Sequence, residues 1–261
     1  MSRLKQPLLA LARRARLLPV LERLRFGKHW LQTRKSNANF TRRNPDFIAP
    51  PAWWMHDMYA HTDLAIYQET GVDHAAILDQ FLTRHLGTGP HDVADWGCGM
   101  ARMARHLGKV HRLVGFDTNP DAIDWISNNL SALTAKAHGP LPPLPAKNDA
   151  FDAVYSISVL THIPQADARA WLGEIHRILR QGGLFLCTVH GAEQTRSLTS
   201  PERARFERGQ PIYRGNVKRG SRNFATYLPE NYLRDDLFGQ FTVLQGPVQE
   251  FGQELWVLRK N

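Results

Sequence analysis

The sequence predicts an α/β fold built on a doubly wound, mostly parallel sheet. Three observations support this fold class. Short apolar runs alternate with longer amphipathic segments between residues 91 and 189, the pattern of strand–helix–strand units. Two of the apolar runs end in a glycine or an acid and lead directly into a helical segment. Two late apolar runs, 241–244 and 254–258, are joined by a short stretch containing Gly and Pro, which indicates a C-terminal antiparallel hairpin.

The remaining elements follow from periodicity and from helix signals. Asn119 and Pro120 have the residue types preferred as a cap and a first-turn residue, so a helix is expected to begin there. The predicted helices are 62–86, 100–107, 120–133 and 165–179, and the predicted strands are 91–96, 112–116, 135–138, 151–158 and 184–189.

The charge divides the chain into a basic arm, residues 1–43, and a domain, residues 44–261. The chain has 261 residues and a formal net charge of +9, yet the arm holds twelve Lys and Arg against one acid, Glu22. The domain is therefore slightly acidic. A second basic stretch, residues 196–222, holds eight bases against two acids. Hydrophobic residues make up 43% of the chain, enough for a packed core and against wholesale disorder.

The arm begins with a segment, 4–18, whose leucines recur at helical spacing while most of its bases fall elsewhere. Pro19 ends or kinks this helix, and a second helical stretch follows through Leu21, Leu24 and Phe26. No apolar run approaches the ~20 residues of a membrane span. Four roles stay open: packing on the domain, peripheral contact with an anionic membrane, nucleic-acid binding and organelle import.

The chain has two cysteines, Cys98 and Cys187, each within a stretch that reads as buried strand or strand edge. So few cysteines, both in sequence typical of buried strands, argue against a disulfide framework and against a cysteine metal site. We expect a cytoplasmic setting, with contact at the membrane surface if the arm provides it.

The most informative stretch is a strand that runs into Gly97 and Gly99 and then opens a helix. Such a turn lets a ligand approach the backbone amides closely. Asp117 ends the next strand, 20 residues after Gly97, where an acid in a doubly wound sheet accepts the hydroxyls of a ribose. A nucleoside-containing cofactor is indicated. Arg102 stands where the dinucleotide fingerprint has its third glycine, which disfavours NAD.

Four ordered motifs over residues 92–190 resemble the class I S-adenosylmethionine-dependent methyltransferases. They are Asp95-x-Gly97-x-Gly99, the strand-ending Asp117, Leu144-Pro145 followed by Phe151-Asp152-Ala153-Val154, and the segment from Trp171 to Gly183. The resemblance implies a Rossmann-like seven-stranded sheet and S-adenosylmethionine as cofactor.

The resemblance also implies roles for single residues. Asp95, Gly97 and Gly99 would line the methionine end of the cofactor, together with Cys98, whose thiol we expect to be a small buried filler rather than a nucleophile. Asp117 would hold the ribose, and the adjacent Thr118 would also contact the cofactor. The backbone around Ser156 to Ser158, Ile157 included, would lie near the amino group of the cofactor. Pro140 replaces an acid that the family often uses for adenine, so adenine would rely on the backbone near Leu141.

His162 and His190 follow the fourth and fifth predicted strands, at the edge where open α/β sheets bind ligands. If the methyl acceptor is a hydroxyl, a neutral histidine is suited to take its proton. Both are therefore candidate general bases, with loop capping as the alternative role.

The pattern formed by residues 142–145, 158–162, Trp171-Leu172 and His190-Gly191 resembles methyltransferases of bacterial surface-polysaccharide and related small-molecule pathways. This resemblance implies a glycan, a glycolipid or another small hydroxylated molecule as the acceptor, and the basic stretch 196–222 favours an acidic one. A nucleic-acid methyltransferase that uses the basic arm is a second hypothesis. Against it, strand four ends in Ser156-Ile157-Ser158-Val159 and lacks the Asn/Asp-Pro-Pro-aromatic motif of amino-directed base methyltransferases, so nucleic acid is disfavoured as a partner. A non-catalytic protein that keeps the fold is the third, and the intact glycines and Asp117 argue against it.

Overall fold

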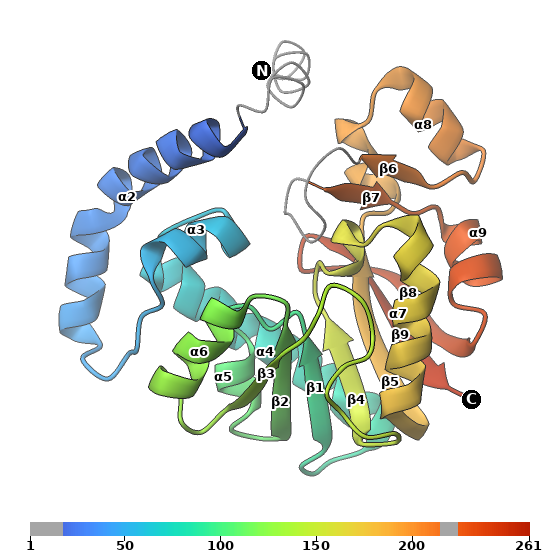
Figure 1. Ribbon diagram of the computed structural model, residues 1–261, viewed down its shortest axis with the longest axis horizontal. Helices are drawn as coiled ribbons and strands as arrows, with labels where there is room; N and C mark the ends of the chain where they lie inside the picture. The colour runs from blue at the N-terminus through green and yellow to red at the C-terminus, as the bar shows by residue number, and fades with distance from the viewer. Residues whose placement is uncertain (1–17, 215–223) are drawn as a thin grey trace. The chain divides into compact units, whose positions relative to one another are not determined.

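The computed structural model describes residues 18–214 and 224–261 (Figure 1). The chain forms two compact units, Met1–Glu69 and Thr70–Asn261. The predicted division at residue 43 falls at the end of the first described helix, whereas the units divide between Glu69 and Thr70. Nearly all of the predicted helix 4–18 lies outside the described residues.

The first unit is helical. It contains α2 (Leu18–Arg43), α3 (Ala52–Tyr59) and the start of α4 (Leu64–Leu86). Pro19 lies in the first turn of α2, where its missing N–H costs no hydrogen bond. Met55, Leu64 and Tyr67 are the buried residues of its small apolar core. Among the described residues, no helix has the length and apolar character that crossing a bilayer would require.

The second unit is built on a seven-stranded sheet of order β3-β2-β1-β4-β5-β9-β8, in which only the β5–β9 and β9–β8 pairs are antiparallel. Its strands are β1 (Asp92–Trp96), β2 (Arg112–Asp117), β3 (Thr134–Ala137), β4 (Phe151–Ser156), β5 (Leu179–Val189), β8 (Phe241–Glu250) and β9 (Gln253–Lys260). The chain order reverses between β1 and β4, and ligands of open α/β sheets bind outside such a reversal. The predicted fold class is confirmed.

Both faces of the sheet are covered by helices, as Figure 1 shows. On β5, Phe185 and Cys187 belong to one apolar cluster while Leu184 and Leu186 belong to the other, because successive side chains point to opposite faces. The first cluster includes the buried face of α7 (Gln165–Ile178). The second includes residues of α4, α5 (Ala104–Leu107) and α6 (Pro120–Asn129). The strand ends are therefore fixed from both sides.

A segment between β5 and β8 forms its own small layer. It contains η2 (Ala192–Ser197), α8 (Ser200–Glu207), β6 (Ile212–Arg214), β7 (Ala225–Tyr227), α9 (Glu230–Tyr232) and the π-helical turn η3 (Leu233–Leu237). β6 and β7 pair antiparallel as a separate two-stranded sheet. Leu198, Phe206, Ile212 and Tyr227 form the buried core of this layer.

Several element ends differ from the sequence prediction. The helix predicted over 100–107 is helical only over α5, because Gly99 and Ala101 have positive φ angles and the intervening chain forms turns. The helix predicted over 120–133 stops at Asn129, after which Leu130 leaves the helical region. β4 ends at Ser156, and Ser158 has a φ of 66°. The strands of the C-terminal hairpin extend to a turn at residues 251–252.

Candidate active site

The turn after β1 needs glycine for two physical reasons. Gly97 has a φ of +87°, a region that side chains disfavour, and a Cβ built there would lie 2.2 Å from Cγ2 of Val159. The backbone N–H groups of Gly97 and Cys98 both donate to the carbonyl of Phe116, at 2.8 and 3.1 Å. The turn is therefore bound to the end of β2.

Asp117 fixes the rest of that turn. One carboxylate oxygen accepts the backbone N–H of Gly99 at 2.8 Å, and the other accepts that of Asn119 at 2.8 Å. Asn119 in turn caps α6 by accepting the N–H of Asp121. The predicted ribose-binding carboxylate is thus half-buried and oriented by two strand–helix turns, and the adjacent Thr118 is exposed.

Asp95 is a buried carboxylate at the end of β1, only 1% exposed. Its Oδ2 accepts the hydroxyl of Tyr155 at 2.6 Å, while Oδ1 is buried with no hydrogen-bond partner among the described residues. Burial raises the pKa of Asp95 to about 7; the Tyr155 hydroxyl opposes the rise and the neighbouring Asp117 carboxylate adds to it. The site therefore holds an acid whose charge changes near neutral pH.

Ser156 ends β4 beside Asp95, since Tyr155 pairs in register with Asp95. Its side chain is fully buried, and its Oγ has no hydrogen-bond partner in the described part of the chain. Ile157, the next residue, is half-buried and packs against the second apolar cluster. Asp95 and Tyr155 share one face of the sheet, so the side chain of Ser156, the next residue, faces the other side. Within the described residues, Asp95 and Ser156 each leave an unpaired buried oxygen near the strand ends, where a polar ligand would satisfy it.

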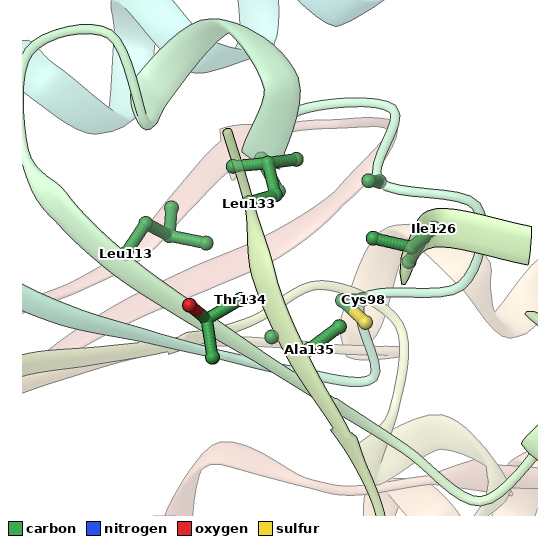
Figure 2. A pocket seen from close by; sticks show the side chains of 9 residues that line it. Cys98, Leu113, Ile126, Leu133, Thr134 and Ala135 are labelled. Atoms are coloured by element: carbon green, nitrogen blue, oxygen red, sulfur yellow. The ribbon is translucent and has the colours of Figure 1, made fainter. Parts of the chain in front are cut away.

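Cys98 lies in the glycine turn, but its thiol points away from the turn into an apolar space formed by β2, β3 and α6 (Figure 2). A Cβ on Gly115 would stand 2.8 Å from this sulfur, so the thiol fills the gap that Gly115 leaves. Burial raises the pKa of Cys98 further above its usual range. The thiol therefore acts as a small filler, and only the backbone of Cys98 is available to a ligand in the turn.

The loop between β3 and β4 carries Leu141, which is exposed. Helix α7 anchors this loop: the Glu174 carboxylate accepts the N–H of Leu144 at 2.7 Å and pairs with Arg177 at 2.6 Å. Arg177 also donates to Asn148 at 2.7 Å. The structure thus places the predicted adenine-side residue on an anchored loop.

The two candidate bases are held by one short strand. Nδ1 of His162 lies 2.6 Å from the carbonyl oxygen of Phe224, and Nδ1 of His190 lies 3.1 Å from that of Thr226. A carbonyl only accepts, so each Nδ1 carries the proton, and in the neutral ring Nε2 keeps its lone pair. Thus β7 and the residue before it set the tautomer of both histidines.

His190 is neutral at physiological pH. Burial lowers its pKa to about 4, the hydrogen bond to Thr226 opposes the shift, and the nearby His162 strengthens it. The two histidines are held by carbonyls two residues apart in the chain, those of Phe224 and Thr226. One short segment therefore positions both candidate bases, each with a defined tautomer.

Gln253, at the start of β9, links Thr188 of β5 to Ser158 in the loop after β4 and lies close to His190. This residue was not among the site residues predicted from the sequence. Its side-chain oxygen accepts the hydroxyl of Thr188 at 2.6 Å, and its Nε2 donates to the hydroxyl of Ser158 at 2.8 Å. The same Nε2 lies 3.4 Å from Nε2 of His190. The Thr188 hydroxyl also accepts the N–H of Ser158 at 2.7 Å. The one sequence feature that could have pointed to Gln253 is the predicted C-terminal hairpin, because its second strand returns antiparallel to β5.

The basic stretch is divided between structural and exposed arginines. Arg214 pairs with Glu202 at 2.6 Å, which lowers the pKa of that carboxyl to about 2, and it also donates to the carbonyl of Ser197 at 2.9 Å. The exposed members are Arg196, Arg203, Arg205 and Arg208. Lys218, Arg219 and Arg222 lie outside the described residues.

Comparison with known proteins finds a family match within the second unit. Residues 93–183 match the family described as a methyltransferase domain. The chain is 30% identical to malonyl-[acyl-carrier protein] O-methyltransferase of Hahella chejuensis over 106 residues, 38% of this chain and 37% of that protein. It is 28% identical to sterol 24-C-methyltransferase of Gibberella zeae over 115 residues, 41% of this chain and 30% of that protein. The chain thus matches about a third of the length of these curated relatives.

Solved structures share the fold. The 1,6-didemethyltoxoflavin-N1-methyltransferase of Burkholderia thailandensis superposes with a TM-score of 0.53 and 18% identity, covering 82% of this chain and 93% of that one. The magnesium protoporphyrin IX methyltransferase of Synechocystis gives a TM-score of 0.53 and 14% identity over 86% and 95% of the chains. Together with the domain match, these findings confirm the resemblance to class I S-adenosylmethionine-dependent methyltransferases.

Proposed function

We propose, on the premise that residues 93–183 form a class I methyltransferase domain, that this protein transfers a methyl group from S-adenosylmethionine to an oxygen acceptor. The observation that carries the choice of oxygen is the arrangement of His190. Its Nδ1 is tied to the Thr226 carbonyl and its low pKa keeps the ring neutral, so Nε2 keeps a lone pair. Among the described residues, only the Gln253 amide, at 3.4 Å, approaches that lone pair, and an acceptor hydroxyl that displaces this long contact would give its proton to Nε2.

The residues present suit the cofactor. Asp95 Oδ1 and Ser156 Oγ are buried acceptors without partners, and the ionised Asp95 would counter the positive charges of the methionine end. The half-buried Asp117 carboxylate, which two backbone amides already orient, would receive the ribose hydroxyls. When bound, S-adenosylmethionine supplies a methyl group on a positively charged sulfur, and its carbon–sulfur bond breaks as the acceptor oxygen bonds to the carbon.

In this proposal the chain aligns the acceptor and removes one proton. As the acceptor oxygen bonds to the methyl carbon, its remaining O–H becomes strongly acidic, so even a base with a pKa of about 4 is sufficient. Nε2 of His190 takes that proton and the ring becomes an imidazolium stabilised by the Thr226 carbonyl. His162, whose Nδ1 is held in the same way, is the second candidate for this role.

The acceptor in this proposal is a glycan, a glycolipid or another small hydroxylated molecule that carries an acidic group. Support comes from the layer that positions the histidines. The segment that leads into β7 also bears the exposed side chains of Arg196, Arg203, Arg205 and Arg208. Guanidinium groups bind phosphate and carboxylate in a bidentate manner, so an anionic acceptor would be held near the same layer.

Calorimetric titration with S-adenosylmethionine, its demethylated product and NAD tests the cofactor. Binding of the first two without NAD is expected, and failure of all three would favour a non-catalytic role. Methyl transfer is then measured on matched acceptors: a neutral sugar, a uronic acid, a sugar phosphate and an amine. We expect the acidic hydroxylated acceptors to react fastest; transfer confined to the amine would contradict oxygen as the acceptor atom.

A further inference from the structure

Helix α2 has one face that is already occupied within its own unit. Phe26 packs edge-on against Trp53, with ring centroids 5.2 Å apart. Further along, the hydroxyl of Thr33 lies 2.7 Å from that of Thr62, and Phe40 belongs to the small apolar core of the unit. Within α2, Phe26, Thr33 and Phe40 are seven residues apart, so they lie on one side of the helix.

The opposite side of α2 presents apolar side chains to solvent. Val20 is 56% exposed, Leu24 66% and Leu31 58%. They are four and seven residues apart, which places all three on the same face. Trp30 is also exposed, but by helical position it lies nearer the packed side. We call Val20, Leu24 and Leu31 the apolar stripe.

Basic side chains flank the apolar stripe. α2 contains seven Lys and Arg and one acid, and that acid, Glu22, lies on the packed side, where it contacts His56 at 3.4 Å and Arg25 at 2.7 Å. The basic residues of α2 are all exposed: Arg23, Arg25, Lys28, Arg34, Lys35, Arg42 and Arg43. By helical position, Arg23 and Arg34 fall to one side of the stripe, and Lys28 and Lys35 to the other.

We propose that the apolar stripe of α2 inserts into the surface of a membrane that contains anionic lipids. Apolar side chains flanked by long cationic ones match such a surface, because the stripe enters the acyl boundary while the flanking Lys and Arg reach the headgroups. A second copy of the helix would set one cationic surface against another. A nucleic acid would contact the Lys and Arg side chains of α2 but would leave its exposed leucines in water.

Gly27 allows a test by gain of binding. It lies between Leu24 and Leu31 on the same face, and a Cβ built there meets nothing within 4 Å. Gly27→Leu therefore extends the stripe without a clash. Burying one more leucine should raise vesicle affinity by about tenfold or more. Gly27→Gln is the matched control: it gives a similar gain in helix propensity with a polar side chain, and no such increase is expected.

The assay is co-sedimentation of the full chain with phosphatidylcholine vesicles, with and without phosphatidylglycerol, at low and high salt. We expect binding only with the anionic lipid, weakened by salt. Leu24→Asp combined with Leu31→Asp should abolish it, and Arg34→Glu with Lys35→Glu should weaken it by about tenfold or more. Val110→Asp, at an exposed apolar position of the second unit, controls for the added charge and should bind as the parent does.

Three results would overturn the proposal. Equal binding of the parent and the double-aspartate variant to anionic vesicles would exclude the stripe. Salt-sensitive binding to RNA or DNA that tolerates both aspartates, without vesicle binding, would assign α2 to nucleic acid. A dimer in sedimentation velocity that Leu24→Asp dissociates, again without vesicle binding, would assign the stripe to a second copy. Circular dichroism verifies that each variant keeps its helices.

Discussion

Gly99 donates its backbone N–H to the Asp117 carboxylate at 2.8 Å, which joins the turn after β1 to the end of β2. The carboxylate that the proposal assigns to the ribose therefore also shapes the glycine turn assigned to the methionine end of the cofactor. A substitution at Asp117 should consequently affect both parts of cofactor binding.

Asp117→Ala should weaken S-adenosylmethionine binding by about 100-fold or more, because two charge-assisted hydrogen bonds are lost at ~1.5–3 kcal/mol each. The fold should survive, since water can replace the carboxylate at this half-exposed position. Calorimetry measures the affinity, and urea denaturation measures the stability. Asp121→Ala, an exposed acid in the first turn of α6, is the control and should bind normally. Unchanged affinity in Asp117→Ala would remove the ribose assignment.

Gly97→Ala should destabilise the protein and abolish cofactor binding. The new Cβ would meet Cγ2 of Val159 at 2.2 Å, and the φ of +87° adds strain of about 1–3 kcal/mol. Val159→Ala in the same chain removes the clash but not the strain. We therefore expect the double variant to recover part of the lost melting temperature. If the single variant melts and binds as the parent does, the turn is more adaptable than its contacts indicate.

Asp95 should make the stability of the cofactor-free protein depend on pH. The folded protein protonates Asp95 near pH 7, whereas its ordinary pKa is 3.8, so the folded state binds more protons between these values. The contribution of Asp95 to the free energy of unfolding is therefore complete below pH 4 and is lost as the pH rises to about 7. Asp95→Asn cannot ionise, and at pH 8 it should be more stable than the parent by on the order of a few kcal/mol.

The same variant should bind S-adenosylmethionine more weakly at pH 8. If the ionised carboxylate holds a positive charge of the cofactor, affinity in the parent rises between pH 6 and 8, while that of Asp95→Asn stays flat. Denaturation and calorimetry across this range provide both readouts. Parallel pH curves for the two proteins would refute the shifted pKa.

His190→Ala should lower kcat by about 100-fold or more and leave cofactor affinity unchanged, because general-base catalysis contributes about 10²- to 10⁴-fold. His162→Ala is the comparison, since His162 is held by the neighbouring carbonyl of Phe224. The variant with the larger loss identifies the base. Full turnover in both would leave alignment of the acceptor as the whole catalytic contribution of the chain.

His190 should reduce stability in acid. Its folded pKa is about 4 against an ordinary 6.5, so the unfolded chain binds an extra proton between these values and stability is lost as the pH falls through that window. His190→Gln should flatten this part of the denaturation profile. His74 and His106, whose pKa values burial also lowers to about 4, should retain their own share of the acid sensitivity.

Gln253→Glu should raise the pKa of His190. The new carboxylate would replace an amide nitrogen 3.4 Å from Nε2 and so favour the imidazolium. NMR titration of the His190 ring measures the shift directly, and the acid limb of the pH–rate profile should move the same way. Gln253→Leu removes the amide donor to Nε2 without adding a charge, so any rise in this pKa should be smaller than in the Glu variant. A ring that titrates identically in the Glu variant would show that Gln253 does not position it.

The sequence by itself determined the order of strands and helices, the glycine turn and the acids at two strand ends. These features depend on local chemistry: periodic burial, glycine where φ is positive, and a cap before Pro120. The same features were enough to recognise the resemblance to class I methyltransferases. The ends of elements were less accurate, as with the helix expected from Met100, because the positive φ of Ala101 is set by the packing of the turn.

Tertiary structure alone decided which groups meet and with what charge. Gln253 reaches Thr188 only because β9 runs antiparallel to β5 in a register that no local signal specifies. The carbonyls of Phe224 and Thr226 fix two histidines more than thirty residues earlier in the chain, and burial moves the pKa values of Asp95 and His190 in opposite directions. Long-range register and desolvation depend on the whole packed domain, which is why the sequence could name these side chains but not their protonation.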